Sequence, residues 1–299
     1  MRRAIGLMLV LAACRHDAPS EFDGTEALRH VEAQLAFGPR ISGTAEARRM
    51  GDWLDSLLRA RADTVVVQAW DHATRRGDTL SLRNFIARFR PEDSRRILFL
   101  AHWDTRPTAD GPASQNTALP VPGANDGASG VAVLLGIAEA LGKAPPSVGV
   151  DLLFVDGEDY GVFPDQDVLL GSTYYARSPV PGPKPLFAVL LDMVGDRDLQ
   201  IYQEGNSMAG AREVVSLVWE TARDLGHGNV FRSSTRHTLT DDHVPLLDAG
   251  FRAIDVIDFD YPAWHTPDDT ADKVSARSLQ VVGDVMMALI RRTGAGSRE

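Results

Sequence analysis

Six side chains that can bind a metal or move a proton lie in the expected loops or at the expected strand ends of this 299-residue sequence. Zinc is held by three or four His, Asp, Glu or Cys side chains. Taken singly, an aspartate after a strand is usually a turn or helix-cap residue. Six such positions in loops or at strand ends together predict a metal site. They are His102, Asp126, Glu158, Asp159, Asp192 and His265.

The local spacing of these residues suggests what some of them do. In AHWDT, His102 and Asp104 are two positions apart and therefore lie on the same side of an extended chain. We expect Asp104 to accept a hydrogen bond from the His102 ring, as carboxylates commonly do beside ligand histidines. In GEDYG, the neighbours Glu158 and Asp159 must diverge. One of them can bind metal while the other faces the substrate as an acid or base.

Apolar strands that alternate with helices position these residues. Such an order predicts an α/β fold, a three-layer sandwich in which a mixed, mostly parallel sheet has helices on both faces. Ligands of such sheets bind beyond the carboxyl ends of the strands. Three apolar runs, Leu98–Leu100, Leu152–Val155 and Val189–Leu191, each precede an acid or a histidine. Because the site needs strand ends from both halves of the chain, we expect a single domain. The expected strands are 64–70, 82–89, 95–104, 149–161, 186–196 and 251–259, and the expected helices are 25–36, 44–60, 129–143, 210–226 and 274–292.

The composition excludes some functions. The chain is 44% hydrophobic, enough for a large core, and carries a formal charge of −10. No stripe of Lys and Arg interrupts the acidic background, so we expect no nucleic-acid partner. No protein partner can be inferred.

The first residues, MRRAIGLMLVLAAC, predict a secretory signal. Two arginines precede an apolar run that is shorter than the about 20 residues of a spanning helix. The ending Leu-Ala-Ala-Cys resembles a bacterial lipobox, which implies a signal peptide at 1–13, lipidation of Cys14, a tether at 14–24 and a catalytic domain at 25–299. The alternatives are an ordinary signal peptide or a buried thiol. The expected location is the bacterial cell envelope, with the protein anchored in the lipid bilayer and facing the periplasm or the exterior.

Seven motifs occur in the order found in the zinc aminopeptidase/glutaminyl cyclase superfamily. The sequence resembles this superfamily from about residue 30 to the end, most closely its bacterial glutaminyl-peptide cyclotransferases. The resemblance implies a zinc exopeptidase-like sandwich. The motifs are FLAHWDTRP, PGANDGASGVAVLLGIAEAL, DLLFVDGEDYG, LLGSTYYAR, LLDMVGD, DDHVPLLDAG and WHTPDDT.

The resemblance also implies roles for individual residues. Asp126, in the glycine-flanked turn GANDGASG, matches the central metal ligand, and Asp159 and His265 match the other two ligands. His102 and Asp192 match the residues that bind a second zinc in the aminopeptidases. One zinc is therefore expected in a cyclase and two in an aminopeptidase.

Glu158 matches the catalytic acid/base, and Asp192 and Asp241 match the acids that hold the leaving amide. The DDH at 241–243 favours the cyclase branch, because aminopeptidases more often have Ser-Asp-His. Asp242, the second residue of DDH, is expected to support the site from behind the residues that act in it. Trp264 matches the indole wall of the cyclase pocket, and Phe163 lies near the position of a further tryptophan of the animal enzymes.

Two departures from the animal cyclases concern the pocket. Asp159 and Asp255 stand where those enzymes have Glu and His. The sequence thus predicts a zinc-dependent cyclotransferase that converts the N-terminal Gln of peptides or proteins to pyroglutamate with release of ammonia. The alternatives are a two-zinc aminopeptidase and, from another class, a non-catalytic peptide-binding lipoprotein. The last is disfavoured because no expected ligand or acid/base residue is missing.

Overall fold

A six-stranded sheet runs through the centre of the computed structural model, which describes residues 20–161 and 167–296. Its strand order is β1-β2-β4-β3-β5-β8. The pairs β1–β2 and β2–β4 are antiparallel, whereas β4–β3, β3–β5 and β5–β8 are parallel. A two-stranded parallel sheet, β6–β7, lies apart from it. The strands are β1 (Thr64–Ala73), β2 (Thr79–Phe89), β3 (Arg96–His102), β4 (Gly149–Val155), β5 (Ala188–Asp192), β6 (Ile201–Gln203), β7 (Phe231–Thr235) and β8 (Ala253–Ile257).

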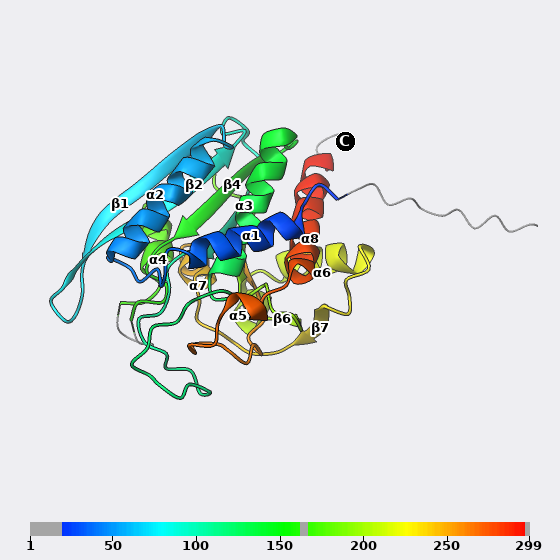
Figure 1. Ribbon diagram of the computed structural model, residues 1–299. Helices are drawn as coiled ribbons and strands as arrows, with labels where there is room; N and C mark the ends of the chain where they lie inside the picture. Colours follow the sequence, from blue (N-terminus) through cyan, green and yellow to red (C-terminus); the bar gives the residue numbers. More distant parts are fainter. Residues whose placement is uncertain (1–19, 162–166, 297–299) are drawn as a thin grey trace, which may run out of the picture.

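Helices cover both faces of the large sheet (Figure 1). Side chains of α1, α2, α3, α6 and α8 form the larger core with one face, and α4 and α7 pack on the other. The helices are α1 (Gly24–Leu35), α2 (Ala45–Arg59), α3 (Ala128–Lys143), α4 (Leu170–Arg177), α5 (Gly205–Gly210), α6 (Arg212–Asp224), α7 (His243–Asp248), the 3₁₀ turn η1 (Ala271–Lys273) and α8 (Ala276–Ala295).

The central strands are largely apolar because they are buried on both sides. In β3, Phe99 and Ala101 point into the larger core, whereas Leu98 and Leu100 point into the smaller one. Successive side chains of a strand point to opposite faces, so a continuous apolar run suits a strand with a helix layer on each side. Most polar residues of these strands then lie at or near the strand ends, although Asp151 of β4 and Asp255 of β8 are buried within their strands.

Helix α3 places the GANDGASG turn at the edge of the sheet. It is apolar on nearly all sides and packs against β3, α1 and α8. A helix that is hydrophobic all round is stable only when it is surrounded by protein. Its burial fixes the position of the turn before it, which carries Asp126.

The expected fold class is confirmed: the chain forms a three-layer sandwich around a mixed, mostly parallel sheet. The structure differs in local detail, because the expected helix 210–226 is divided at Ala211 between α5 and α6. Short elements that had no sequence prediction, among them α4, α7 and β6, complete the fold. Cys14 and Phe163 lie outside the described residues. Among the described helices, none combines the length and apolar character needed to cross a membrane.

Candidate metal centre and active site

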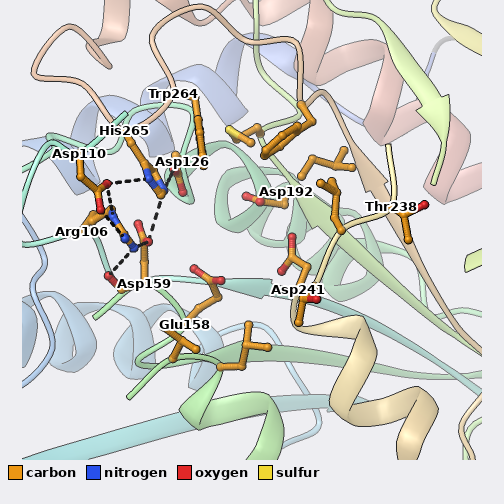
Figure 2. A pocket seen from close by; sticks show the side chains of 17 residues that line it. Arg106, Asp110, Asp126, Glu158, Asp159, Asp192, Thr238, Asp241, Trp264 and His265 are labelled. Atoms are coloured by element: carbon orange, nitrogen blue, oxygen red, sulfur yellow. Dashed lines mark hydrogen bonds and ion pairs between the residues drawn. The ribbon is translucent and has the colours of Figure 1, made fainter. Parts of the chain in front are cut away.

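A cleft of about 460 Å³ opens at the carboxyl ends of the parallel strands. The parallel pairing brings the ends of β3, β4, β5 and β8 to one edge of the sheet. Figure 2 shows Asp126, Glu158, Asp159, Asp192 and His265 around this cleft, with Asp241 beside them. The structure therefore brings together candidate residues that are separated by up to 139 positions in the chain (126 to 265).

Asp126, Asp159 and His265 form the first ligand group. One potential ligand atom from each residue lies within 4.8 Å of the others. The Nε2 atom of His265 is 3.6 Å from Asp126 Oδ2 and 3.4 Å from Asp159 Oδ1. Both aspartates are buried, and Asp159 Oδ2 accepts no hydrogen bond from the described residues. A buried carboxylate oxygen without a partner is costly unless a cation binds it. Two carboxylates and one imidazole therefore fit zinc.

The backbone of the GANDGASG turn fixes Asp126. The amides of Asn125 and Asp126 donate to the two carboxylate oxygens of Asp269, at 2.8 and 3.1 Å, and Tyr261 donates to the same group at 2.7 Å. Gly127 allows close packing, because a Cβ there would lie 2.4 Å from His102 Nε2. The turn thus needs a glycine beside the ligand, and a carboxylate from far along the sequence to accept hydrogen bonds from its amides.

His102, Asp126 and Asp192 form a second ligand group that shares Asp126 with the first. His102 Nε2 lies 3.1 Å from Asp126 Oδ1 and 3.3 Å from Asp192 Oδ1. All three residues are buried. These donors would suit a second cation, and Asp126 belongs to both ligand groups.

Asp104 lies behind these groups and contacts more than the histidine. It is fully buried, and its Oδ1 lies 3.5 Å from His102 Nδ1. Its two oxygens also accept hydrogen bonds from the amides of Glu158 and Asp159, at 3.2 and 3.1 Å. The expected hydrogen bond from the His102 ring to Asp104 is absent, because His102 Nδ1 has no hydrogen-bond partner among the described residues. Asp104 instead orients the backbone of the paired acids.

Glu158 points into the cleft, away from Asp159 (Figure 2). Burial, followed by the charge of Asp159, raises the pKa of Glu158 well above its usual value. The Asp241 and Asp242 charges act in the same direction, and His102 opposes them. The divergence of two adjacent acids expected from GEDYG is present: Asp159 belongs to the ligand group and Glu158 faces open space.

Asp192 and Asp241 line the same side of the cleft (Figure 2). Burial raises the pKa of Asp192 to about 7, and the charge of Asp241 contributes to the shift. Burial also raises the pKa of Asp241. The two carboxyls thus resist simultaneous ionisation. Asp242 is buried and lies outside the residues that line the cleft.

The wall opposite the acids is apolar. Leu239, Phe259 and Trp264 line it, and the rings of Phe259 and Trp264 are 4.9 Å apart. The indole of Trp264 also stacks on His265, with ring centroids 4.1 Å apart. The cleft therefore pairs a charged floor with a small aromatic wall, the usual composition of a small-ligand site. No role in the site was predicted from the sequence for Leu239 or Phe259.

Arg106 and Asp110 contact the first ligand group and were also not predicted. They lie in the β3–α3 loop, which we define as residues 103–127. Arg106 donates to Asp159 and to Asp110, and Asp110 contacts His265 Nδ1 at 3.0 Å. Burial lowers the pKa of His265, but Asp159 and Asp110 outweigh it and raise the pKa to about 9. The HWDTRP motif contains Arg106, which was the only sequence signal.

A third group of potential ligands lies between helices far from the cleft. Glu26, His30 and Glu139 approach one another on α1 and α3. Glu139 Oε1 already accepts from Arg61 at 2.7 Å and lies 3.1 Å from His30 Nε2. This group is therefore an ion-pair network that joins the helices.

Solved structures with the same fold include cyclases and exopeptidases. Porphyromonas gingivalis glutaminyl cyclase is 39% identical, with a TM-score of 0.87 over 91% of this chain and 99% of that one. A Zn-dependent exopeptidase from Parabacteroides distasonis is 35% identical, with a TM-score of 0.87 over 92% and 99%.

Curated relatives show the same division. Aminopeptidase YwaD of Bacillus subtilis is 26% identical over 79% of this chain. A glutaminyl-peptide cyclotransferase of Gloydius blomhoffii is 25% identical over 69% of it. The chain spans 48% and 64% of the lengths of these two proteins. Residues 84–290, which include both ligand groups, match the family described as Peptidase family M28. The chain is thus an enzyme of peptidase family M28, with the donor set that zinc requires.

Proposed function

We propose that the protein is a zinc-dependent glutaminyl-peptide cyclotransferase that acts on the N-terminal Gln of peptides or proteins. The observation that carries the proposal is the acid pair Asp192 and Asp241, which faces Glu158 across a small cleft with an aromatic wall. A carboxyl at position 241 can accept hydrogen bonds from an amide NH₂ group. The 39% identity with Porphyromonas gingivalis glutaminyl cyclase supports the same conclusion.

The reaction joins the α-amine of the substrate to its own side chain. The amine nitrogen bonds to the γ-carboxamide carbon, the bond from that carbon to the amide nitrogen breaks, and ammonia leaves. Asp126, Asp159 and His265 would hold a zinc ion, which would supply a Lewis acid for the carboxamide.

The side chains of the cleft handle the protons and the orientation. Glu158 takes a proton from the α-amine and returns it to the departing nitrogen. Asp192 and Asp241, sharing a proton, hold the leaving amide. The Trp264, Phe259 and Leu239 wall covers the apolar part of the glutamine side chain and limits the access of water, which would otherwise hydrolyse the amide.

The products of the reaction test the proposal. Peptides with N-terminal Gln should release ammonia and become resistant to Edman degradation, whereas peptides with N-terminal Leu should remain intact. Release of free amino acids without ammonia would contradict the proposal.

The second candidate is a two-zinc aminopeptidase, favoured by the His102–Asp126–Asp192 group that shares Asp126 with the first group. In that enzyme Glu158 would activate a water instead of an amine. Two tightly bound zinc ions per chain, together with stepwise release of N-terminal residues, would establish this alternative.

We also propose that Cys14 carries a lipid anchor on the bacterial cell envelope. The proposal rests on the sequence LVLAAC, with the only cysteine of the chain at its end. Cys14→Ser should move the protein from the membrane fraction to the soluble fraction. If radiolabelled palmitate does not enter the wild-type protein, there is no such anchor.

A further inference from the structure

Four side chains form a closed ring behind the first ligand group. Arg106 Nη1 donates to Asp159 Oδ1 at 2.6 Å. Its Nε and Nη2 atoms donate to the two oxygens of Asp110, at 2.6 and 2.7 Å. Asp110 Oδ1 lies 3.0 Å from Nδ1 of His265, whose Nε2 faces Asp159. Figure 2 shows this ring on the side of His265 and Asp159 that faces away from Glu158.

The ring leaves the metal-binding atoms free. The Asp110 carboxylate faces Nδ1 of His265, so when the ring is neutral the proton is favoured on Nδ1 and the lone pair of Nε2 is directed toward Asp126 and Asp159. Arg106 occupies Oδ1 of Asp159, whereas Oδ2 is buried and without a partner among the described residues. The Asp110–His265 and Arg106–Asp159 contacts thus each hold one atom of a ligand side chain and leave another atom of it available to bind the metal.

Arg106 is not placed to bind a substrate carboxylate. The residue is 7% exposed, although it lines the cleft. Three of its nitrogens already donate to Asp110 and Asp159, and both edges of the guanidinium are used. Its contacts are those of a residue that holds other side chains.

The main chain of the β3–α3 loop is joined to the same histidine. The amide of Gly111 donates to the carbonyl of His265 at 2.9 Å. A Cβ at Gly111 would lie 2.2 Å from the carbonyl oxygen of Trp264, so only glycine permits this approach. His265 itself has a φ of 52°, a conformation that a histidine needs outside support to keep.

We propose that Arg106 and Asp110 are positioning residues that preorganise the zinc site through the Asp159–Arg106–Asp110–His265 ring. The inference rests on the proposed zinc site but not on the choice between cyclase and aminopeptidase. Groups that orient metal ligands typically change metal affinity by roughly 10- to 100-fold. The ring also explains why a cleft rich in carboxylates contains one buried arginine.

The experiment measures zinc affinity by competition with a chromophoric chelator, without reference to turnover. Asp110→Ala should weaken zinc binding roughly 10- to 100-fold. Asp110→Asn should recover part of the loss, because its amide oxygen can still accept from His265 Nδ1. Arg106→Lys should weaken binding as well, because an ammonium cannot donate to both carboxylates in the forked geometry.

The spectrum of bound Co²⁺ gives a second measurement. The d–d bands should shift in Asp110→Ala and return toward the wild-type positions in Asp110→Asn. The matched control is Asp55→Asn, which removes the charge of a carboxylate in another Arg–Asp pair four residues apart, the partly exposed Arg59–Asp55 pair on α2. Zinc affinity should not change in this control.

Asp126→Ala separates the two proposals. If Asp126→Ala retains tight zinc, the metal site itself is wrong. If Asp126→Ala loses zinc while Asp110→Ala and Arg106→Lys bind it like the wild type, the site stands and the positioning role is wrong. Circular dichroism of each variant identifies any that do not fold, and the milder Asp110→Asn and Arg106→Lys then decide the question.

Discussion

Glu158 is the residue whose replacement should separate chemistry from metal binding. Its carboxyl faces the cleft while its neighbour Asp159 belongs to the ligand group. Glu158→Gln keeps the shape of the side chain but removes the base. Turnover should fall by roughly 10²- to 10⁴-fold, the usual contribution of general acid–base catalysis. Zinc content should stay unchanged when measured by atomic absorption. Near-normal turnover with full zinc would exclude a catalytic role.

His102 should distinguish one metal ion from two. It contacts Asp126 and Asp192 but does not belong to the first ligand group. In a cyclase with one zinc ion, His102→Ala should retain the tightly bound metal. In a two-zinc aminopeptidase, the same change should reduce the zinc content from two ions to one. Metal analysis after dialysis gives the answer, and His265→Ala, which removes a ligand of the first group, serves as the positive control.

The residue types in loops and at strand ends predicted a metal site, and the family resemblance implied which residues form its ligand groups. Apart from Asp104, the residues that orient the ligands were not predicted. His265 and Asp110 are 155 positions apart, and Asp126 and Asp269 are 143 positions apart. No local pattern relates such pairs, since only the tertiary fold brings them together. Leu239 and Phe259 were missed for a related reason: an apolar residue in a loop can equally well be part of the core.

At the scale of elements, a buried ion group joins the three strands β2, β3 and β4 at the end of the sheet away from the cleft. Asp151 of β4 accepts from Arg96 of β3 at 2.8 and 2.9 Å, and from Arg88 of β2 at 3.1 Å. All three residues are buried. The negative charge of Asp151 thus partly compensates the positive charges of two arginines that have little access to water.

Asp151→Ala should strongly destabilise the protein, because it leaves two buried guanidinium groups without their carboxylate. Breaking a buried ion group by removing one partner typically costs about 3–5 kcal/mol. Urea unfolding should show a loss of this order in the free energy of unfolding. The zinc affinity of the folded variant should remain normal, because Asp151 lies at the opposite end of β4 from Glu158. A loss below about 1 kcal/mol would show that solvent or neighbouring carbonyls replace the carboxylate.

The elements that could be predicted were those with long apolar runs or with amphipathic patterns, such as α1 and α2. The central strands and α3 are mostly apolar, so their sequences indicate burial directly. The strand order could not be predicted, because β3 and β4 have nearly interchangeable apolar sequences. Six-residue helices such as α5 and α7 have too few turns for a periodic pattern, and their packing against β8 decides their conformation.

At the scale of the whole molecule, a net charge of −10 is combined with many buried carboxyls. Burial raises the pKa of Asp258 to about 7, and the charges of Asp196 and Asp260 contribute to the shift. Burial, together with the charge of Asp104, raises the pKa of Asp156 to about 7. The pKa of Glu204 is lowered to about 2, because burial is outweighed by the nearby His243 ring and by hydrogen bonds from backbone amides. The carboxyls with raised pKa values make the native state sensitive to pH between 4 and 7.

The metal-free protein should therefore lose stability as the pH rises from 5 to 8. In this range an unfolded aspartate is ionised, whereas native Asp258 keeps its proton until the pH passes about 7. The native state then binds more protons than the unfolded state, so the free energy of unfolding decreases with pH. Glu204 does not oppose the trend, because its contribution is lost only below about pH 4. Urea unfolding of protein freed of metal by a chelator should show the decrease. Asp258→Asn should reduce it by on the order of 2 kcal/mol. An equal decrease in wild type and variant would show that Asp258 is already ionised in the native protein at pH 5.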